Sequence, residues 1–102
     1  MSISVGKYNF EGPYMDTSKL QNRAGVYAIH CLSNSVYTLI DVGESANVKE
    51  RIDSHERKGC WESNCSDVLV VSVLYTPFLQ PSDRQAIEYI IRKQLDPPCG
   101  RK

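Results

Sequence analysis

Two apolar stretches near the middle of the chain, 25–32 and 36–43, are rich in β-branched and aromatic residues. Three turn-forming residues, 33–35, separate them, so the pattern predicts a β-hairpin. A third stretch, 67–75, is apolar at successive positions and predicts a strand that is buried on both faces. The chain therefore predicts a mainly antiparallel, three-stranded sheet that needs helices on its faces.

Two segments have the apolar spacing of helices. In the segment 44–58, Val48, Ile52 and His55 share one face. The segment 82–95 opens with the spacing of a capping box and ends before Pro97. The residues between these helices and the third strand, 60–66, predict a loop. Strands and helices together predict an α/β domain of the α+β kind.

The N-terminal residues 1–22 form an extension to this core. Tyr8, Phe10 and Tyr14 occupy alternating positions, which predicts an edge strand with an aromatic inner face, ended by Pro13. We expect one domain over 1–102, with the core at 23–98 and a frayed tail at 99–102.

The hairpin register places candidate chemistry on one face. If 33–35 is a three-residue loop, Tyr27 lies opposite Asp41. Gly43 ends the second strand, where a missing side chain allows close approach of another group. Ser45 is a suitable N-cap, so backbone amides from Ser45 to Asn47 are expected to face an anion. These groups, with Arg51 of the following helix, are expected to converge.

These residues carry a family resemblance. Gly25-Val26-Tyr27 looks like the first signature of the GIY-YIG nuclease superfamily, and Asp41-Val42-Gly43 stands in the place of the second. The helix pattern of the family is matched by Ser45, Asn47, Val48, Arg51 and Ile52. Near the end of the chain the matching residues are Arg84, Ile87, Glu88, Ile91, Pro97 and Pro98. The resemblance covers most of the chain from about Tyr8 onward, and it implies a GIY-YIG-like sandwich.

The resemblance also implies roles. Arg51 would hold phosphate oxygens, Glu88 would bind one Mg²⁺ or Mn²⁺, and Tyr27 would take part in proton transfer. The chain departs from the family at Asp41, where the second signature has tyrosine, and at Gly100, where asparagine is usual. From periodicity alone, Glu88 is an exposed helix carboxylate in i,i+4 pairs, with Arg84 and Arg92 one turn away on either side.

Asp41 and His55 each have several interpretations. Asp41 would accept the proton of Tyr27, reach the metal, repel the phosphate, or simply bind nearby amides at a strand end. His55 is a second candidate for proton transfer because histidine titrates near neutrality. The alternative for His55 is a packed, hydrogen-bonded residue at the core edge.

Composition sets limits on function. The chain has 102 residues, 41% hydrophobic and 24% charged, which is typical of a soluble globular domain. No apolar run approaches a membrane span, and we expect a cytoplasmic protein without a membrane partner. Twelve basic residues balance twelve acidic ones, so binding to nucleic acid is expected to be weak and salt-sensitive. The candidate nucleic-acid contacts are Arg23, Gly43, Ser45, Asn47, Lys49 and Arg57.

The four cysteines are expected to stay reduced in the cytosol, with Cys31 as a small buried residue. A structural Zn²⁺ bound by His55, Cys60, Cys65 and Cys99 is disfavoured, because no second closely spaced pair accompanies Cys60 and Cys65.

Three functions remain at this stage. The first is a metal-dependent endonuclease that hydrolyses DNA, with a protein partner or a homodimer supplying specificity. The second is a weak or inactive copy of the fold that binds nucleic acid or protein. The third is a zinc-stabilised interaction domain.

Overall fold

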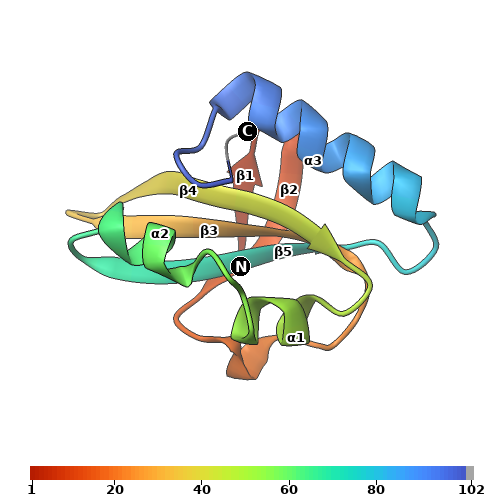
Figure 1. Ribbon diagram of the computed structural model, residues 1–102, viewed down its shortest axis with the longest axis horizontal. Helices are drawn as coiled ribbons and strands as arrows, with labels where there is room; N and C mark the ends of the chain where they lie inside the picture. The colour runs from red at the N-terminus through yellow and green to blue at the C-terminus, as the bar shows by residue number, and fades with distance from the viewer. Residues whose placement is uncertain (101–102) are drawn as a thin grey trace.

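A five-stranded antiparallel sheet forms the centre of the computed structural model, which describes residues 1–100 (Figure 1). The strands are β1 (Ser2–Val5), β2 (Tyr8–Tyr14), β3 (Gly25–Ser33), β4 (Val36–Ser45) and β5 (Val68–Tyr75), and their spatial order is β1-β2-β5-β3-β4. The expected three-stranded sheet is therefore wrong. The α+β class and the antiparallel pairing agree with the structure.

The two additional strands come from the N-terminal segment. Gly6 has a φ of 61° and forms the turn between β1 and β2, a conformation in which glycine has no steric penalty. β2 then pairs with β5, so the N-terminal hairpin extends the sheet. Pro13 does not end β2 as expected. The register shifts between Glu11 and Tyr14, and this irregularity accommodates a residue without an N–H group.

The β3–β4 hairpin has a different register from the expected one. Its turn contains only Asn34 and Ser35, both with positive φ, as a two-residue turn requires. A further shift occurs next to Ile29, where an extra residue is inserted in β4. Tyr27 consequently pairs with Gly43, and the expected pairing of Tyr27 with Asp41 is wrong. Each of these two changes shifts the register by one residue. Since side chains alternate between the faces of a sheet, the combined shift leaves Tyr27 and Asp41 on the same face.

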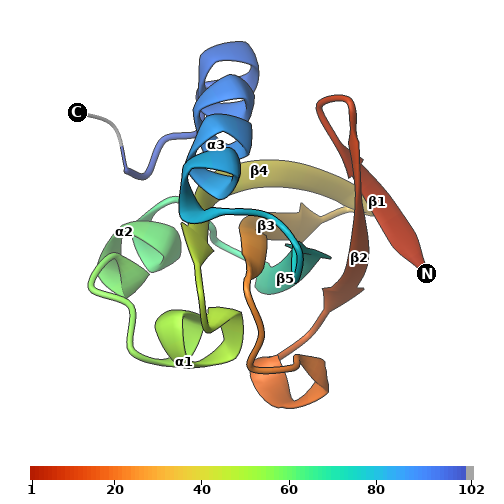
Figure 2. The same ribbon diagram turned by 90° about the vertical axis from the view of Figure 1, so that its right-hand side faces the viewer.

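Helices cover both faces of the sheet (Figure 1 and Figure 2). Helix α3 (Pro81–Leu95) lies on one face, and α1 (Val48–Asp53) and α2 (Lys58–Ser63) lie on the other, near the short helix η1 (Thr17–Lys19). The expected helix over 44–58 is wrong, because β4 continues to Ser45 and α1 ends at Asp53. The expected loop over 60–66 contains most of α2. None of the helices in residues 1–100 is long and apolar enough to cross a membrane.

Each face has its own hydrophobic core. Below α1 and α2, the core includes Tyr27, Ile29, Ile52, Trp61 and Val73. Below α3, it includes Val5, Phe10, Val26, Val42 and Ile91. Adjacent residues of β3 thus point into different cores, as the alternation of side chains along a strand requires.

Two disulfides connect α2 and the residues after it to other parts of the fold. Cys31 of β3 pairs with Cys65, and Cys60 of α2 pairs with Cys99 after α3. The expectation of reduced cysteines is wrong in this structure. Cys99 is fully buried and its N–H donates to the carbonyl of Ile40, 3.0 Å away, so the expected fraying does not begin at residue 99. The last two residues of the expected tail, 101 and 102, lie outside the described residues.

Candidate active site

Tyr27 is held in a tight position against the neighbouring strand. Its side chain is only 1% exposed and crosses Gly43. A Cβ atom at position 43 would lie 2.2 Å from the phenol oxygen. Position 43 therefore needs glycine because the tyrosine ring occupies the space of a side chain. Gly43 is itself buried, so the group that approaches it closely is the side chain of Tyr27.

His55 fixes the phenol group. Its Nε2 atom lies 2.7 Å from the Tyr27 oxygen, and its Nδ1 atom accepts the N–H of Arg57 at 3.0 Å. Burial lowers the pKa of His55 to about 4, so the ring is neutral at neutral pH. Because Nδ1 accepts, the single ring proton lies on Nε2 and is donated to Tyr27. In this state, His55 orients the phenol and does not remove its proton.

The phenol of Tyr27 is neutral over the physiological range. Burial raises the pKa of Tyr27 to about 12, although the charges of Arg51 and Arg57 oppose this change. Since its oxygen already accepts from His55, the hydroxyl proton remains to be donated elsewhere. Tyr27 is thus better suited to donate a proton than to act as a base.

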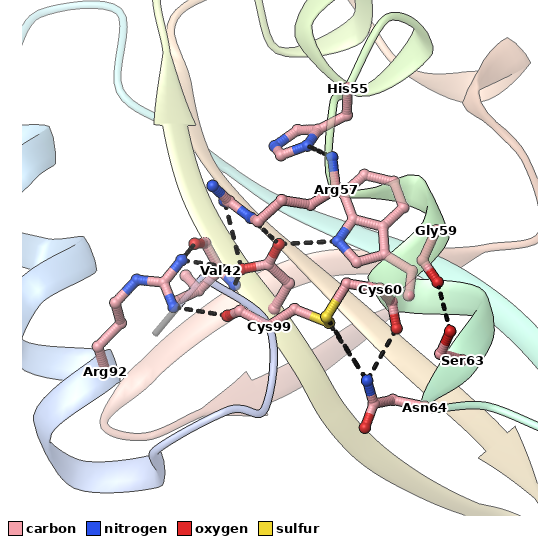
Figure 3. The surroundings of a disulfide bond; sticks show 11 residues. Val42, His55, Arg57, Gly59, Cys60, Ser63, Asn64, Arg92 and Cys99 are labelled. Carbon is pink, nitrogen blue, oxygen red and sulfur yellow. Dashed lines mark hydrogen bonds and ion pairs between the residues drawn. A yellow bond between two sulfur atoms is a disulfide. The ribbon is translucent and has the colours of Figure 1, made fainter. Parts of the chain in front are cut away.

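Asp41 lies at the centre of a buried charge cluster. Two of its partners, Arg57 and Arg92, point toward the part of β4 that carries Val42 (Figure 3). Its Oδ2 atom accepts from Nε of Arg57 at 2.8 Å and from the indole N–H of Trp61 at 2.7 Å. Its Oδ1 atom accepts from Arg92 and from the N–H of Val42, both at 2.8 Å, and from Nη2 of Arg57 at 3.4 Å. This enclosure favours the interpretation in which neighbouring donors bind Asp41, and it leaves the carboxylate little room for a metal or a proton.

Arg92 connects this cluster to Glu88. Its Nε atom donates to Oε2 of Glu88 at 3.0 Å, and its Nη1 atom donates to the carbonyl of Cys99 at 2.9 Å. Its Nη2 atom also donates to the carbonyl of Val42. Arg84, the other expected partner of Glu88, instead pairs with Glu44. Glu88 is therefore held by one arginine, and that arginine is fixed by β4 and by the C-terminal segment.

These contacts link six residues in the order Tyr27, His55, Arg57, Asp41, Arg92, Glu88. At Arg57 the main-chain N–H binds His55 and the guanidinium binds Asp41, so the hydrogen bonds form two separate series that meet at this residue. Arg57, Glu88 and Arg92 line a groove of about 680 Å³ beside α3, together with Tyr89 and Lys93. The structure thus brings together side chains from β3, β4, α3 and the α1–α2 connection.

Arg51 lies beside the same chain. Its guanidinium forms two hydrogen bonds with Glu56, at 2.6 and 2.9 Å. The pKa of Arg51 is raised, chiefly by Glu56, and Tyr27 contributes to the same change. Arg51 also lines a second, shallow hollow of about 310 Å³ with Ser45 and Asn47. Arg51 is therefore placed to hold an anion near the phenol.

The backbone amides at the start of α1 are already bound within the protein. The N-cap is Asn47, not Ser45 as expected. The N–H of Asn47 donates to Ser45, the N–H of Val48 to the carbonyl of Arg23, and the N–H of Glu50 to Asn22. Of the amides in the expected anion site, that of Asn47 is therefore occupied by Ser45. Lys49 pairs with Asp53, and the side chain of Arg23 is exposed.

Sequence reasoning missed Arg92, Trp61 and Glu56 as parts of this site. The sequence identifies Arg92 only as a helix neighbour of Glu88, and Trp61 lies in the segment 60–66 that was expected to be a loop. One usable signal existed, because a buried tryptophan usually needs an acceptor for its indole N–H and Asp41 is an acceptor in the same predicted core. No comparable signal pointed to Glu56.

The thiols that would bind zinc are consumed by the two disulfides. Within residues 1–100, no group of three or more histidine, cysteine, aspartate or glutamate side chains is arranged to hold a metal ion. A metal at Glu88 would therefore depend on water and substrate for most of its ligands.

Comparison with known proteins returns no match: no family model, no curated protein and no solved structure is similar to this chain.

Proposed function

We propose that the protein is a metal-dependent endonuclease of the GIY-YIG type that hydrolyses phosphodiester bonds of DNA. The observation that supports this best is the set of hydrogen-bonded residues that links Tyr27 to Glu88 through His55, Arg57, Asp41 and Arg92, with Arg51 beside Tyr27. Glu88 and Arg57 line the groove beside α3, Arg51 lines the shallow hollow next to Ser45, and Tyr27 is hydrogen-bonded to His55. Arginine, tyrosine and glutamate are also the side-chain types that phosphodiester hydrolysis needs.

Each residue has a role that follows from its surroundings. Arg51 and Arg57 present guanidinium groups that bind phosphate oxygens and stabilise the charge that develops on them. Tyr27, kept neutral by burial and oriented by His55, donates a hydrogen bond to the phosphoryl group or a proton to the departing alkoxide. Asp41 positions Arg57 and does not react.

Glu88 is suited to hold Mg²⁺ or Mn²⁺. Magnesium in phosphoryl-transfer sites commonly uses one or two carboxylates and keeps several waters, so a single carboxylate in an open groove fits it. When bound, such an ion would lower the pKa of a coordinated water and neutralise phosphate charge. Arg92 would hold Glu88 in orientation through its Nε atom.

A second candidate function is a weak or inactive copy of the fold that binds nucleic acid or a protein. Two observations favour it: Asp41 is enclosed by donors, and Tyr27 is only 1% exposed. The chain also has no net charge, so the groove must attract DNA through a local cluster of cations. A protein partner or a second copy of the chain would supply specificity in either case.

The cellular setting is part of the proposal. Disulfides persist in oxidising compartments and on the extracellular side, whereas cytosolic thiols are kept reduced. The two disulfides therefore support an oxidising or extracellular setting and weigh against the expected cytoplasmic one.

Cleavage assays test the activity. Labelled duplex, branched and single-stranded DNA are incubated at low salt with Mg²⁺ or Mn²⁺, using wild type, Glu88→Ala and the control Glu62→Ala. Glu62 is an exposed acid on α2 whose side chain makes no ion pair within residues 1–100. Cleavage that requires metal, disappears in Glu88→Ala and persists in Glu62→Ala supports the nuclease. Binding without cleavage in all three supports the second candidate.

A further inference from the structure

Glu56 lies between the cationic groups of the proposed site. Its two carboxylate oxygens accept from both terminal nitrogens of Arg51, at 2.6 and 2.9 Å. The same carboxylate lies 3.9 Å from Nη1 of Arg57 and 3.9 Å from Nδ1 of His55. One acidic side chain thus faces two guanidinium groups and the imidazole that orients Tyr27.

The geometry of this contact is the one that arginine uses for phosphate. A guanidinium binds a carboxylate or two phosphate oxygens through the same pair of parallel N–H donors. The side chain of Glu56 is 62% exposed, so it leaves and returns without opening the core. A flexible acidic side chain in this position competes with any anion for the donors of Arg51.

Glu56 links two arginines that line different hollows of the surface. Arg51 lines the shallow hollow next to Ser45 and Asn47, whereas Arg57 lines the larger groove next to Glu88. Glu56 binds Arg51 closely and lies 3.9 Å from Arg57. A phosphate that binds both guanidinium groups therefore competes with the Glu56 carboxylate for the same donors.

We infer that the Glu56 carboxylate occupies the site of a substrate phosphate, and that a phosphodiester group of DNA displaces it from Arg51 and Arg57. This inference rests on the proposed function for the identity of the ligand. Glu56 then acts as an internal competitor: it weakens binding, and it keeps Arg51 oriented beside Tyr27 until a phosphate takes its place. No covalent bond is made or broken in this exchange.

The inference predicts that removing the charge of Glu56 strengthens DNA binding by more than removing the charge of another nearby acid. The test measures binding of a labelled duplex DNA, without metal, to wild type, Glu56→Gln and the matched control Glu62→Gln. Both variants lose one negative charge in neighbouring segments. We expect Glu56→Gln to bind about 5- to 10-fold more tightly than Glu62→Gln, with a salt dependence steeper by about one counterion. Adding Arg51→Gln to Glu56→Gln is expected to abolish this gain.

Equal affinities for Glu56→Gln and Glu62→Gln, or weaker binding by Glu56→Gln, would overturn the inference. An equal gain in the presence and absence of Arg51 would also overturn it, because the gain would then come from the general field of the protein.

A second measurement separates this inference from the proposed function. If none of the variants binds DNA, the nuclease proposal fails. Thermal unfolding with inorganic phosphate then tests whether Glu56 occupies an anion site. We then expect phosphate to raise the unfolding temperature of Glu56→Gln more than that of wild type or Glu62→Gln. The absence of this difference would show that Arg51 and Arg57 do not form an anion site.

Discussion

Two carboxylates in this molecule share the same arginine and lie in opposite surroundings. Asp41 is fully buried and binds Arg57 and Arg92, together with Trp61. Glu56 is 62% exposed and contacts Arg51 closely and Arg57 more loosely. Each is an acid between two guanidinium groups, so the pattern of charges is nearly the same. What differs is access to water.

This difference decides what each carboxylate can do. A buried charge that loses its partners stays desolvated, so the cluster at Asp41 is fixed and helps to hold the fold together. An exposed ion pair contributes little to stability and exchanges readily with other ions. Arg57 is therefore held firmly by Asp41 and only loosely by Glu56. The following predictions test this contrast, from the largest expected effect to the smallest.

Replacing Asp41 by asparagine tests the buried cluster most directly. The variant leaves Arg57 and Arg92 without their anion and places an amide group among donors, so the free energy of unfolding is expected to fall by about 3–5 kcal/mol. Urea denaturation followed by circular dichroism measures it. Asp41→Tyr, which restores the signature residue, is expected to lose at least as much stability. A change below that of an ordinary surface substitution would show that the cluster is not structural.

Removing the Cys60–Cys99 disulfide tests how Arg92 is held. Replacing both cysteines by serine removes a cross-link between residues separated by 39 positions in the sequence. It also removes a restraint on Cys99, whose carbonyl accepts a hydrogen bond from Arg92. We expect a loss of about 2–4 kcal/mol in denaturant unfolding. Thiol titration of the unfolded, unreduced protein provides the control, since wild type is expected to show no free thiol. Free thiols in that sample would contradict the disulfides.

Acidification is expected to break the link between the cluster and Tyr27. Burial lowers the pKa of His55 to about 4 and that of His30 to about 4, whereas both lie near 6.5 in the unfolded chain. The unfolded state therefore binds more protons between pH 6.5 and 4, and stability falls as pH decreases through this window. The loss is expected to reach a few kcal/mol in total. Thermal unfolding against pH measures it, and His30→Asn separates the two histidines. A flat profile would contradict the neutral state of His55.

Replacing Trp61 by phenylalanine removes one donor to Asp41 and keeps both arginines. We expect a loss of about 1–2 kcal/mol, because one acceptor oxygen of a buried carboxylate loses a hydrogen bond while the aromatic packing remains. DNA affinity is expected to change less than stability, since Arg57 is still anchored. The comparison uses denaturant unfolding and binding on the same protein. A loss as large as that of Asp41→Asn would mean that Trp61 itself holds the cluster.

The smallest effect on stability is expected for Glu56→Gln. The carboxylate has its pKa lowered to about 2, mainly by the hydrogen bonds from Arg51, but it is exposed and solvent screens the pair. Its unfolding curve is expected to coincide with that of wild type within error. Loss of stability comparable with Trp61→Phe would show that the exposed pair is a structural contact, which would reverse the contrast between the two carboxylates.

The sequence contained enough information for the core elements and not enough for their register. The β3–β4 hairpin, strand β5 and helix α3 follow from apolar periodicity and from proline signals, which are local. The exact pairing depends on a two-residue turn and on an extra residue near Ile29. Both shift the register without changing the hydrophobic pattern, so alternation alone could not reveal them. The strand that carries Tyr8, Phe10 and Tyr14 was predicted as an edge strand and is β2. It is not at the edge, because β1 pairs with it, and β1 was missed because Ser2–Val5 is short and partly polar.

Some members of the candidate site were predictable from the sequence, but their contacts were not. Tyr27, Arg51 and Glu88 were selected by a resemblance, and in the structure Arg51 and Glu88 line two different hollows. The surroundings of Asp41 could not be read from the sequence, since its partners Arg57, Trp61 and Arg92 come from segments far along the chain. The pairing of the cysteines could not be predicted for the same reason, because only the folded chain determines which thiols meet.

The short segment after α3 has a consequence for association between molecules. A strand at the border of a sheet offers unpaired N–H and C=O groups to other chains, which is a common start of aggregation. On β4, the backbone of Cys99 binds Ile40 and Arg92 binds the carbonyl of Val42, so these polar groups are already occupied. The Cys60–Cys99 bond keeps this covering segment in place. Oxidation therefore protects the border strand from intermolecular pairing, and a reducing solution exposes it.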